Sequence, residues 1–402
     1  MSQISPFVGL RYDPSRVGSL DAVTAPPYDV ISDEERVRLA GSSPYNIARA
    51  MIAEVRPGDD PDAPYARAAA EFARWRDEAI VVPTEGPAFY PYAMEVALQG
   101  RSRTIRGVIC AVELEDWGGS VIPHERTMAE PIEDRLRLTR AVRANLSSIY
   151  AVIRGPNDVL GDLLDGVAKE PSDSEAVDEA GVRHRLWMRA EMPGLADSLR
   201  GETLMIADGH HRYTMALRYR DEMREERGPG PWDRVMMLIV DAASESPPVL
   251  PFHRLLVGGE APRAGERVRD LEELLETVDD TKLVYGTASL EEGVLVHRVA
   301  DLSGAPPTVC ALHQQVLTDA GDMLRFTPDA VEAEWAVRRG EAVAAFFLPA
   351  TDAARIRAVV DRGERLPQKS TFFWPKPRTG LVMRSLEPDG ATPRPPAAAR
   401  AS

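Results

Sequence analysis

The stretch Thr203-Leu204-Met205-Ile206-Ala207-Asp208-Gly209-His210-His211-Arg212-Tyr213 decides the fold. Its first five residues are a short apolar run of the kind that forms a buried strand. The residues that follow keep a helical pattern to about Glu226. A strand that runs straight into a helix is typical of α/β architecture. The next apolar run, Arg234–Asp241, predicts a strand in the centre of a sheet.

The turn between this strand and helix has the composition of an anion-binding site. A helix N-terminus offers unpaired N–H groups and partial positive charge. Gly209 lets a ligand oxygen approach the backbone, and Arg212 can fork onto two phosphate oxygens. His210 and His211 can donate hydrogen bonds or accept a proton, and Asp208 could hold Mg²⁺ or orient a histidine. The alternative is a helix capped by Asp208 or Gly209, with histidines that only fill space.

A second polar segment, Pro123-His124-Glu125-Arg126-Thr127, lies in a loop before a charged helix at Glu133–Ala144. A glutamate held near a substrate hydroxyl can act as a general base. The alternative is a solvated polar turn. Arg135 and three further arginines of the helix are expected to form mainly a solvated face.

The third candidate is Gln368-Lys369-Ser370-Thr371 near the end of the folded chain. Only four of the 48 basic residues are lysines, which a GC-rich coding bias explains, and Lys369 and Lys376 are two of them. Lysine and hydroxyl groups are phosphate-binding types, so Lys369 and Ser370 are candidates. The alternative is an aromatic-rich strand that packs Phe372, Phe373 and Trp374.

Composition excludes several classes of protein. The 402 residues carry 48 basic and 63 acidic side chains, a net charge of −15 with a pI near 5.1, which argues against a nucleic-acid partner. Apolar runs are too short to span a membrane, and no secretory signal is visible. With two cysteines 200 positions apart, we expect a cytoplasmic protein. The nucleotide loops, the serine-hydrolase elbow and the zincin motif are absent.

The wider pattern predicts a mixed α/β (α+β) chain. We expect Thr24–Ile31 to be extended, and helices at Ser32–Ala40, Pro64–Ile80 and Arg263–Val278. A hairpin is expected from Phe89–Leu98 and Arg103–Leu114. We divide the chain into an N-terminal α+β region at 1–100, a central mixed-sheet domain at 101–260, a C-terminal α+β region at 261–386 and a disordered tail at 387–402.

Five segments resemble a bacterial family called domain of unknown function 1015. They occur in order and cover nearly the whole chain except the tail. They are Ala25-Pro26-Pro27-Tyr28-Asp29-Val30-Ile31, Pro123-His124-Glu125-Arg126-Thr127, Ile206–Tyr213, Pro251-Phe252-His253-Arg254 and Pro367-Gln368-Lys369-Ser370-Thr371. The family name implies no activity.

The Asp208-Gly209-His210-His211-Arg212 motif also looks like that of free-serine kinases of the ParB/sulfiredoxin superfamily. This resemblance implies a ParB/sulfiredoxin-like central domain in which Gly209–His211 and Arg212 hold nucleotide phosphates. It implies that Glu125 is the base and that Asp208 assists the metal or the acceptor. About 80 residues separate the two motifs, more than the small kinases need.

We therefore expect a nucleotide-dependent phosphotransferase that acts on the hydroxyl of a small metabolite, with free L-serine as the leading candidate. Mg²⁺ at Asp208 and ATP or ADP would be its cofactors. The expected residues fall into three groups: Glu125, Asp208 and His211 are catalytic, Gly209, His210, Arg212, Lys369 and Ser370 bind phosphate, and Tyr28, Asp29, His124, Arg126 and Thr127 line the substrate pocket. The alternatives are a non-catalytic nucleotide sensor and a metal-dependent hydrolase that uses His124, His210, His211 and Asp208. The sequence indicates no nucleic-acid or membrane partner and leaves the oligomeric state open.

Overall fold

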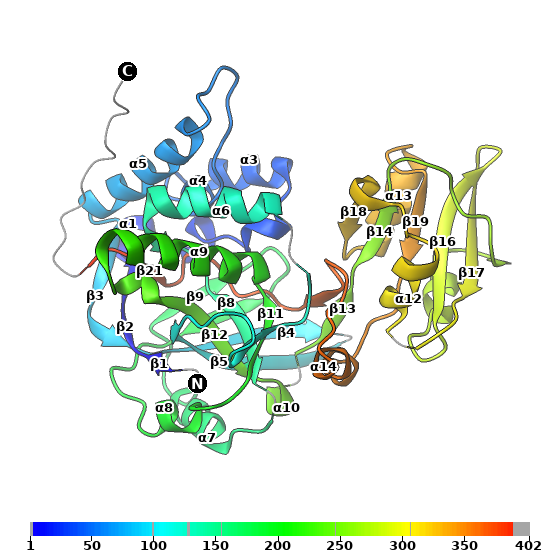
Figure 1. The fold of residues 1–402 in the computed structure, drawn as a ribbon. Coiled ribbons are helices and arrows are strands. Elements are labelled where there is room, and N and C mark those ends of the chain that lie inside the picture. Colours follow the sequence, from blue (N-terminus) through cyan, green and yellow to red (C-terminus); the bar gives the residue numbers. More distant parts are fainter. Residues whose placement is uncertain are drawn as a thin grey trace. The chain divides into compact units, whose positions relative to one another are not determined.

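The computed structural model describes residues 3–98, 100–126, 129–153, 155–245, 247–305 and 307–388 (Figure 1). Two compact units are present. Unit 1 comprises Met1–Ile122, Met128–Pro247 and Pro375–Ser402, and unit 2 comprises Pro123–Thr127 and Pro248–Trp374. The mixture of helices and mixed sheets confirms the expected fold class.

Unit 1 is built on a nine-stranded mixed sheet in the order β6-β11-β8-β12-β5-β4-β10-β9, with β1 also paired to β5. The strands are β1 (Ile4–Ser5), β4 (Tyr90–Leu98), β5 (Arg101–Glu113), β6 (Val121–Pro123), β8 (Ile149–Ile153), β9 (Ser174–Val177), β10 (Arg183–Leu186), β11 (Leu204–Asp208) and β12 (Arg234–Asp241). Strand β12 runs parallel to β8 and antiparallel to β5. All its residues after Arg234 are buried, which explains why this strand is apolar on both faces.

Helices and a smaller sheet complete unit 1. The sheet has the order β3-β2-β21-β7, from Val81–Ala88, Phe7–Tyr12, Met383–Ser385 and Ala144–Asn145. The helices are α1 (Pro14–Val17), α2 (Leu20–Val23), α3 (Asp33–Ser42), α4 (Ala48–Met51), α5 (Ala63–Asp77), α6 (Ala129–Val142), α7 (Asp158–Val167), α8 (Leu195–Ser198), α9 (His210–Arg227) and α10 (Ala242–Glu245), with 3₁₀ turns at Tyr28–Val30 and Pro231–Asp233. Helices α6 and α9 lie side by side (Figure 1).

Several apolar cores hold these layers together, and two of them position the site. One lies on the large sheet and includes Val108, Ile149 and Ile206, with Tyr213 of α9 packed onto it. The other joins α5 and α6 to the small sheet through Phe72, Trp75 and Met383 among others. Because α9 belongs to the first core from its fourth residue onward, its first turn is fixed against the sheet.

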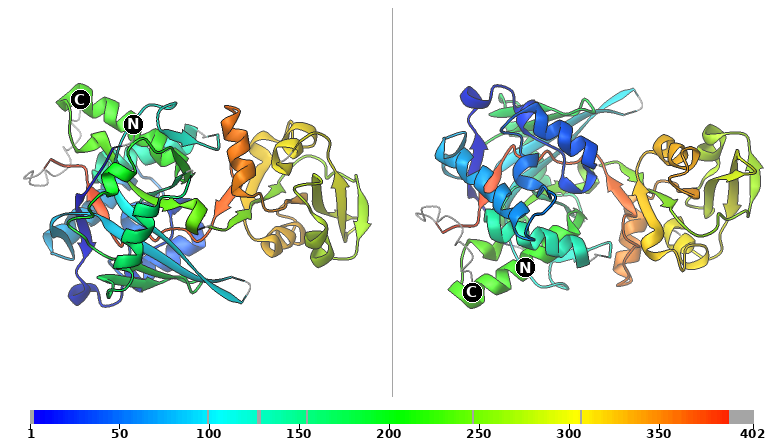
Figure 2. Two further views of the ribbon diagram at one scale, coloured as in Figure 1. Left: turned by 90° about the horizontal axis from the view of Figure 1, so that it is seen from below. Right: turned by 90° about the horizontal axis from the view of Figure 1, so that it is seen from above.

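Unit 2 contains a six-stranded sheet in the order β15-β17-β16-β19-β14-β18. Figure 2 shows its strands and helices, coloured from yellow-green to orange, from two further sides. Its strands are β14 (His253–Leu256), β15 (Glu266–Val268), β16 (Val284–Glu291), β17 (Val294–Asp301), β18 (Leu324–Thr327) and β19 (Ala344–Phe347). A two-stranded ribbon pairs β13 (Val249–Pro251) with β20 (Thr371–Phe373). The helices are α11 (Leu271–Thr277), α12 (Thr308–Gln315), α13 (Ala330–Arg338) and α14 (Ala353–Asp361), with a 3₁₀ turn at Gly321–Met323.

Several sequence predictions are confirmed, and two are wrong. The helices α3 and α5, the β4–β5 hairpin and the strand–helix passage β11–α9 form where expected. The predicted helix Arg263–Val278 is instead β15 followed by α11, because Glu266–Val268 pairs with β17. The segment Thr24–Ile31 is not extended throughout, since Tyr28–Val30 forms a 3₁₀ turn after the two prolines.

The two units do not coincide with the four expected segments. Residue 100 lies in the turn of the β4–β5 hairpin inside unit 1, and the chain returns to unit 1 at Pro375. Long-range strand pairing, which composition does not reveal, is the physical reason. Most of the expected tail at 387–402 lies outside the described residues. None of the described helices is both long and apolar enough to cross a membrane.

Candidate functional site

The first turn of α9 is positioned by a sharp change of backbone direction. Strand β11 ends at Asp208, Gly209 adopts φ +99°, and α9 begins at His210. A Cβ at position 209 would lie 3.0 Å from Arg212 Nε, so both the backbone angle and the close approach require glycine. The 18-residue helix that follows leaves the N–H groups of its first turn without acceptors inside the helix.

A buried ion cluster lies at this turn. Asp208 Oδ2 accepts a hydrogen bond from Arg212 Nη2 at 2.5 Å, and Asp208 Oδ1 accepts one from Lys376 Nζ. The three side chains are no more than 8% exposed. Arg212 Nη1 donates to Ser147 Oγ at 3.0 Å and to the Ser148 carbonyl at 2.5 Å. The remaining donor, Arg212 Nε, is buried and has no acceptor among the described residues.

These contacts are incompatible with Asp208 as the expected Mg²⁺ ligand. Each of its carboxylate oxygens already accepts a hydrogen bond from a cation, so a Mg²⁺ ion would have to displace Arg212 or Lys376 to reach them. Across the described ranges, no three histidine, cysteine or acidic side chains are grouped so as to hold a metal ion. The geometry therefore gives no support to a resident Mg²⁺ at Asp208 or to the metal-hydrolase alternative.

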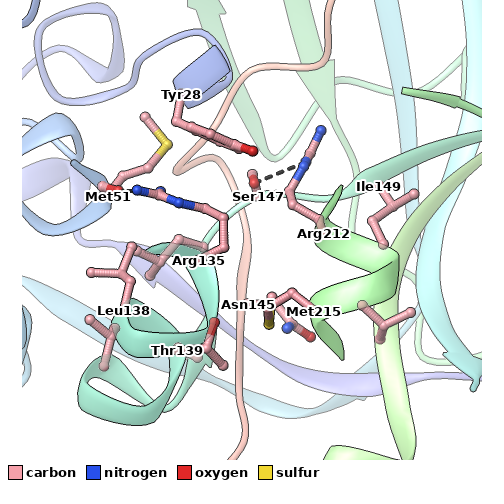
Figure 3. A pocket seen from close by; sticks show the side chains of 14 residues that line it. Tyr28, Met51, Arg135, Leu138, Thr139, Asn145, Ser147, Ile149, Arg212 and Met215 are labelled. Atoms are coloured by element: carbon pink, nitrogen blue, oxygen red, sulfur yellow. Dashed lines mark hydrogen bonds between the residues drawn. The ribbon is translucent and has the colours of Figure 1, made fainter. Parts of the chain in front are cut away.

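A small cavity adjoins Arg212 within unit 1 (Figure 3). Its free volume is about 50 Å³, enough for a few water molecules and well below that of a typical ligand pocket. Tyr28, Ser147 and Arg212 contribute polar groups at one end, while Leu138 and Met215 are among its apolar walls. The cavity thus offers a polar end beside the buried ion cluster.

Arg135 also lines this cavity, contrary to the expectation of a solvated helix face. Its side chain is 8% exposed, and its Nη1 donates to the Met51 carbonyl at 2.7 Å. The guanidinium lies 4.2 Å from the centroid of the Tyr28 ring, a cation–π contact. The burial follows from the packing of α6 against α5, which turns this position of the helix inward.

Of the remaining predicted residues of unit 1, His210 and His211 lie in the first turn of α9, and Asp29 does not line the cavity. His210 is buried and its carbonyl accepts a hydrogen bond from Thr214 Oγ1. His211 is half-buried at the second helical position. Asp29 is exposed and does not belong to the residues that line the cavity, although its neighbour Tyr28 does.

In unit 2, Glu125 is bound by the backbone of the segment Lys369–Thr371. Glu125 Oε2 accepts from the Lys369 amide at 3.0 Å, and Oε1 accepts from the Ser370 and Thr371 amides at 3.0 and 2.9 Å. Thr371 Oγ1 adds a fourth hydrogen bond at 2.8 Å. Lys369 has φ +51°, a conformation that lets successive amides converge on one anion. The segment is therefore an anion-binding concavity occupied by a carboxylate of the same unit.

The neighbours of Glu125 also make contacts within unit 2. His124 is fully buried, and its Nε2 lies 2.6 Å from Thr371 Oγ1. Ser370 Oγ donates to the Pro367 carbonyl at 2.6 Å, and Lys369 Nζ lies 5.4 Å from the centroid of the Phe252 ring. Arg126 is exposed, and Thr127 lies outside the described residues. The roles predicted for Lys369 and Ser370 in phosphate binding stay predictions.

Two residues escaped the sequence reasoning. Lys376 was noted only for the rarity of lysine in this arginine-rich chain, which was the available signal. Arg254 is fully buried, and no carboxylate of the described residues lies within ion-pair distance of it. Its Nη1 donates to the Phe252 carbonyl at 2.5 Å, and its Nε lies 3.4 Å from His313 Nε2. Burial lowers the pKa of Arg254 to about 10, and burial together with the nearby guanidinium lowers the pKa of His313 to about 4. For Arg254, the available sequence signal was the Pro251–Arg254 motif.

Comparison with known proteins identifies a family. The family model described as protein of unknown function (DUF1015) matches residues 4–327, well over half of the chain. The chain belongs to this family. No curated protein matches it.

Three solved structures are distantly similar to this chain. A free serine kinase in complex with AMP has 14% identity, covers 67% of this chain and 88% of its own, and superposes with a TM-score of 0.37. A conserved hypothetical protein from Pyrococcus furiosus has 14% identity, coverages of 65% and 92%, and a TM-score of 0.34. SbnI from Staphylococcus aureus, truncated at its C-terminus, has 12% identity, coverages of 71% and 84%, and a TM-score of 0.33. Similarity at this level supports no statement about activity.

Proposed function

We propose that this DUF1015 protein is a nucleotide-dependent phosphotransferase whose acceptor is the hydroxyl of a small metabolite, with free L-serine as the first candidate. The observation that carries the proposal is the first turn of α9. Two buried cations, Arg212 and Lys376, lie at the N-terminus of an 18-residue helix that is entered through a left-handed glycine. Helix N-termini with adjacent cations are recurrent phosphate sites.

Within unit 1, the proposed task is to hold the phosphates of ATP or ADP. The N–H groups of the first turn of α9 point along the helix axis toward the ligand, and Gly209 leaves room for a phosphate oxygen. Arg212 Nε supplies a buried donor that lacks an acceptor within the described chain. Asp208 holds both cations in place, so their charge is already desolvated when a phosphate arrives.

Phosphoryl transfer depends mainly on positioning and on neutralising phosphate charge. Arg212, Lys376 and the helix N-terminus would do this work, with His210 and His211 as additional hydrogen-bond donors. No step is assigned to a metal ion bound by the protein, because Asp208 does not fit that task. In an assay, Mg²⁺ would enter with the nucleotide.

Within unit 2, the proposed task of Glu125 is to accept the proton of the acceptor hydroxyl. The three amides and one hydroxyl that surround its carboxylate favour the charged form, which a base requires. The same hydrogen bonds also make the carboxylate a weaker base. This second effect favours a rival function, a nucleotide-binding sensor in which Glu125 only organises the segment Lys369–Thr371.

One experiment separates the two functions. Purified protein is incubated with Mg²⁺ and ATP or ADP and a panel of amino acids and sugars, and phosphorylated products are measured by mass spectrometry. Glu125→Gln should abolish transfer and leave nucleotide affinity by calorimetry largely unchanged, while Glu364→Gln, an exposed glutamate of unit 2, should leave both unchanged. Nucleotide binding without any product would favour the sensor, and absence of binding would refute both.

A further inference from the structure

The buried guanidinium of Arg254, on β14 of unit 2, makes all its hydrogen bonds to uncharged acceptors. Its Nη1 donates to the Phe252 carbonyl at 2.5 Å and its Nε to His313 Nε2 at 3.4 Å. A third contact runs from Nη2 to the Gln368 carbonyl at 3.5 Å. Burial and the nearby guanidinium lower the pKa of His313 to about 4, so this ring is neutral at pH 7. A buried charge without compensation strongly destabilises a fold, so an anion is expected close to Arg254.

The contact with Gln368 connects Arg254 to Glu125 through a single peptide group. The carbonyl of Gln368 and the amide of Lys369 belong to the same planar peptide bond. The carbonyl accepts from Arg254 Nη2, and the amide donates to Glu125 Oε2 at 3.0 Å. The negative end of this peptide dipole therefore faces the cation, and its positive end faces the carboxylate. Hydrogen bonds arranged in such a chain polarise and strengthen one another.

The charges of Arg254 and Glu125 also act on each other through space. Burial lowers the pKa of Arg254 to about 10, and the Glu125 carboxylate opposes this effect. Two hydrogen bonds with one peptide between them place the guanidinium within about 9 Å of the carboxylate. Glu125 is therefore the anion that compensates Arg254, at a distance longer than that of a direct ion pair.

Other charged or titratable groups of unit 2 surround this pair. They are His124 and Arg126 next to Glu125, His253 next to Arg254, Cys310 and His313 on α12, and Lys369. Burial raises the pKa of Cys310 to about 11 and lowers that of His253 to about 4, so neither group is charged at pH 7. Of the cations Arg126, Lys369 and Arg254, only the last is fully buried. Its field at Glu125 is therefore the least screened by solvent.

We propose that Arg254 is the positioning residue of Glu125 and that, through the peptide between Gln368 and Lys369, it keeps the carboxylate ionised and fixed in place. The hydrogen bonds to Phe252 and His313 orient the guanidinium so that its remaining arm reaches this peptide. A lysine lacks the planar fork and cannot make the three contacts together. The positioning itself requires no activity. Its consequence for catalysis rests on the proposed function, in which Glu125 is the base.

The titration of the Glu125 carboxyl group tests the proposal on the whole chain. Protein labelled with ¹³C at the glutamate side-chain carboxyls is followed by NMR from pH 7 downward, and Glu125→Gln assigns the signal. Arg254→Met removes the charge and keeps the volume. At an effective dielectric constant of about 20, this loss should raise the titration midpoint of Glu125 by about one pH unit.

Two further variants separate the charge of Arg254 from its packing. Arg254→Lys keeps the charge and should restore most of the wild-type midpoint. Arg325→Met is the matched control, because Arg325 lies on the adjoining strand β18 and also donates to carbonyls, but is exposed. It should leave the midpoint of Glu125 unchanged.

A double-mutant cycle tests the same coupling at pH 7, without a titration. Unfolding of unit 2 by urea is measured for Arg254→Met, for Glu125→Gln and for the double variant. Each single variant leaves one buried charge uncompensated, so the double variant should be destabilised by less than the sum of the two. Arg325→Met combined with Glu125→Gln should be additive.

The outcomes separate this proposal from the proposed function. A midpoint raised in Arg254→Met and restored in Arg254→Lys supports the positioning role, and so does a non-additive cycle. An unchanged midpoint together with an additive cycle overturns it. Where transfer is measured, the acid limb of its pH profile should move with the midpoint in Arg254→Met. A wild type that transfers no phosphate refutes the proposed function and leaves the result on Glu125 standing.

Discussion

The buried carboxylate of Asp208 allows the most quantitative prediction. Its two oxygens bind Arg212 and Lys376, and all three side chains are no more than 8% exposed. Asp208→Asn preserves the size of the side chain but removes the negative charge, so that two buried cations lose this counter-charge. Removing one partner of a buried ion pair costs about 3–5 kcal/mol. We expect the free energy of unfolding of unit 1 to fall by that amount.

The assay is urea denaturation followed by intrinsic fluorescence, with the transitions of the two units fitted separately because a two-unit chain need not unfold in one step. Asp221→Asn is the matched control, since Asp221 lies on the same helix and pairs with Arg220 while 64% exposed. Such a surface pair contributes about 0–1 kcal/mol. Combining Asp208→Asn with Lys376→Met should show a coupling energy of about 0.5–3 kcal/mol.

The result that would refute this reasoning is a small and uncoupled effect. If Asp208→Asn and Asp221→Asn shift the urea midpoint equally, the cluster is hydrated and contributes no more than a surface pair. The assignment of Arg212 and Lys376 as buried cations ready for a phosphate would then lose its basis.

Three further predictions concern other parts of the chain. Gly209→Ala should lower the free energy of unfolding by about 1–3 kcal/mol, because Gly209 has a φ of +99° and a Cβ there would crowd Arg212. Gly161→Ala is the control, because Gly161 lies inside α7 with open space around it, and this variant should raise the free energy of unfolding by about 0.5–1 kcal/mol. Native protein at pH 7 should react slowly with a thiol reagent, because burial raises the pKa of Cys310 to about 11 and raises that of Cys110 still further; fast labelling of either thiol before unfolding would contradict this. Burial and a neighbouring guanidinium lower the pKa of His253 to about 4, so the unfolded chain binds a proton between pH 6.5 and 4 that the folded chain does not. Unit 2 should therefore lose up to about 3 kcal/mol as the pH falls through that range, and His253→Gln should flatten the pH dependence measured by urea denaturation.

Local signals in the sequence predicted the elements that local chemistry controls. Ser32 caps α3 by accepting a hydrogen bond from the Glu35 amide, as the capping pattern indicates. The turn at Gly209 was recognisable because a buried strand there passes directly into a helix. In both cases the residues that decide the structure are within a few positions of one another.

Contacts between distant parts of the chain were not predictable in the same way. Lys376 reaches Asp208 across 168 positions, and the amides of Lys369–Thr371 reach Glu125 across more than 240. Neither contact leaves a periodic pattern in the sequence. The strand Glu266–Val268 formed inside a predicted helix for the same reason, since its partner strand lies about 30 positions further on.

The two carboxylates singled out by the sequence act first on the protein itself. Asp208 pairs with two cations in unit 1, and Glu125 fills an anion-binding concavity in unit 2. A buried cation without a counter-charge would destabilise the fold, and so would a set of convergent amides without an acceptor. A phosphate site that stays folded without its ligand therefore needs an internal group that takes the place of the phosphate. Each carboxylate is such a group. If α9 has the function proposed above, an incoming phosphate would have to share or replace the hydrogen bonds of Asp208, and this exchange would set how tightly a nucleotide binds there.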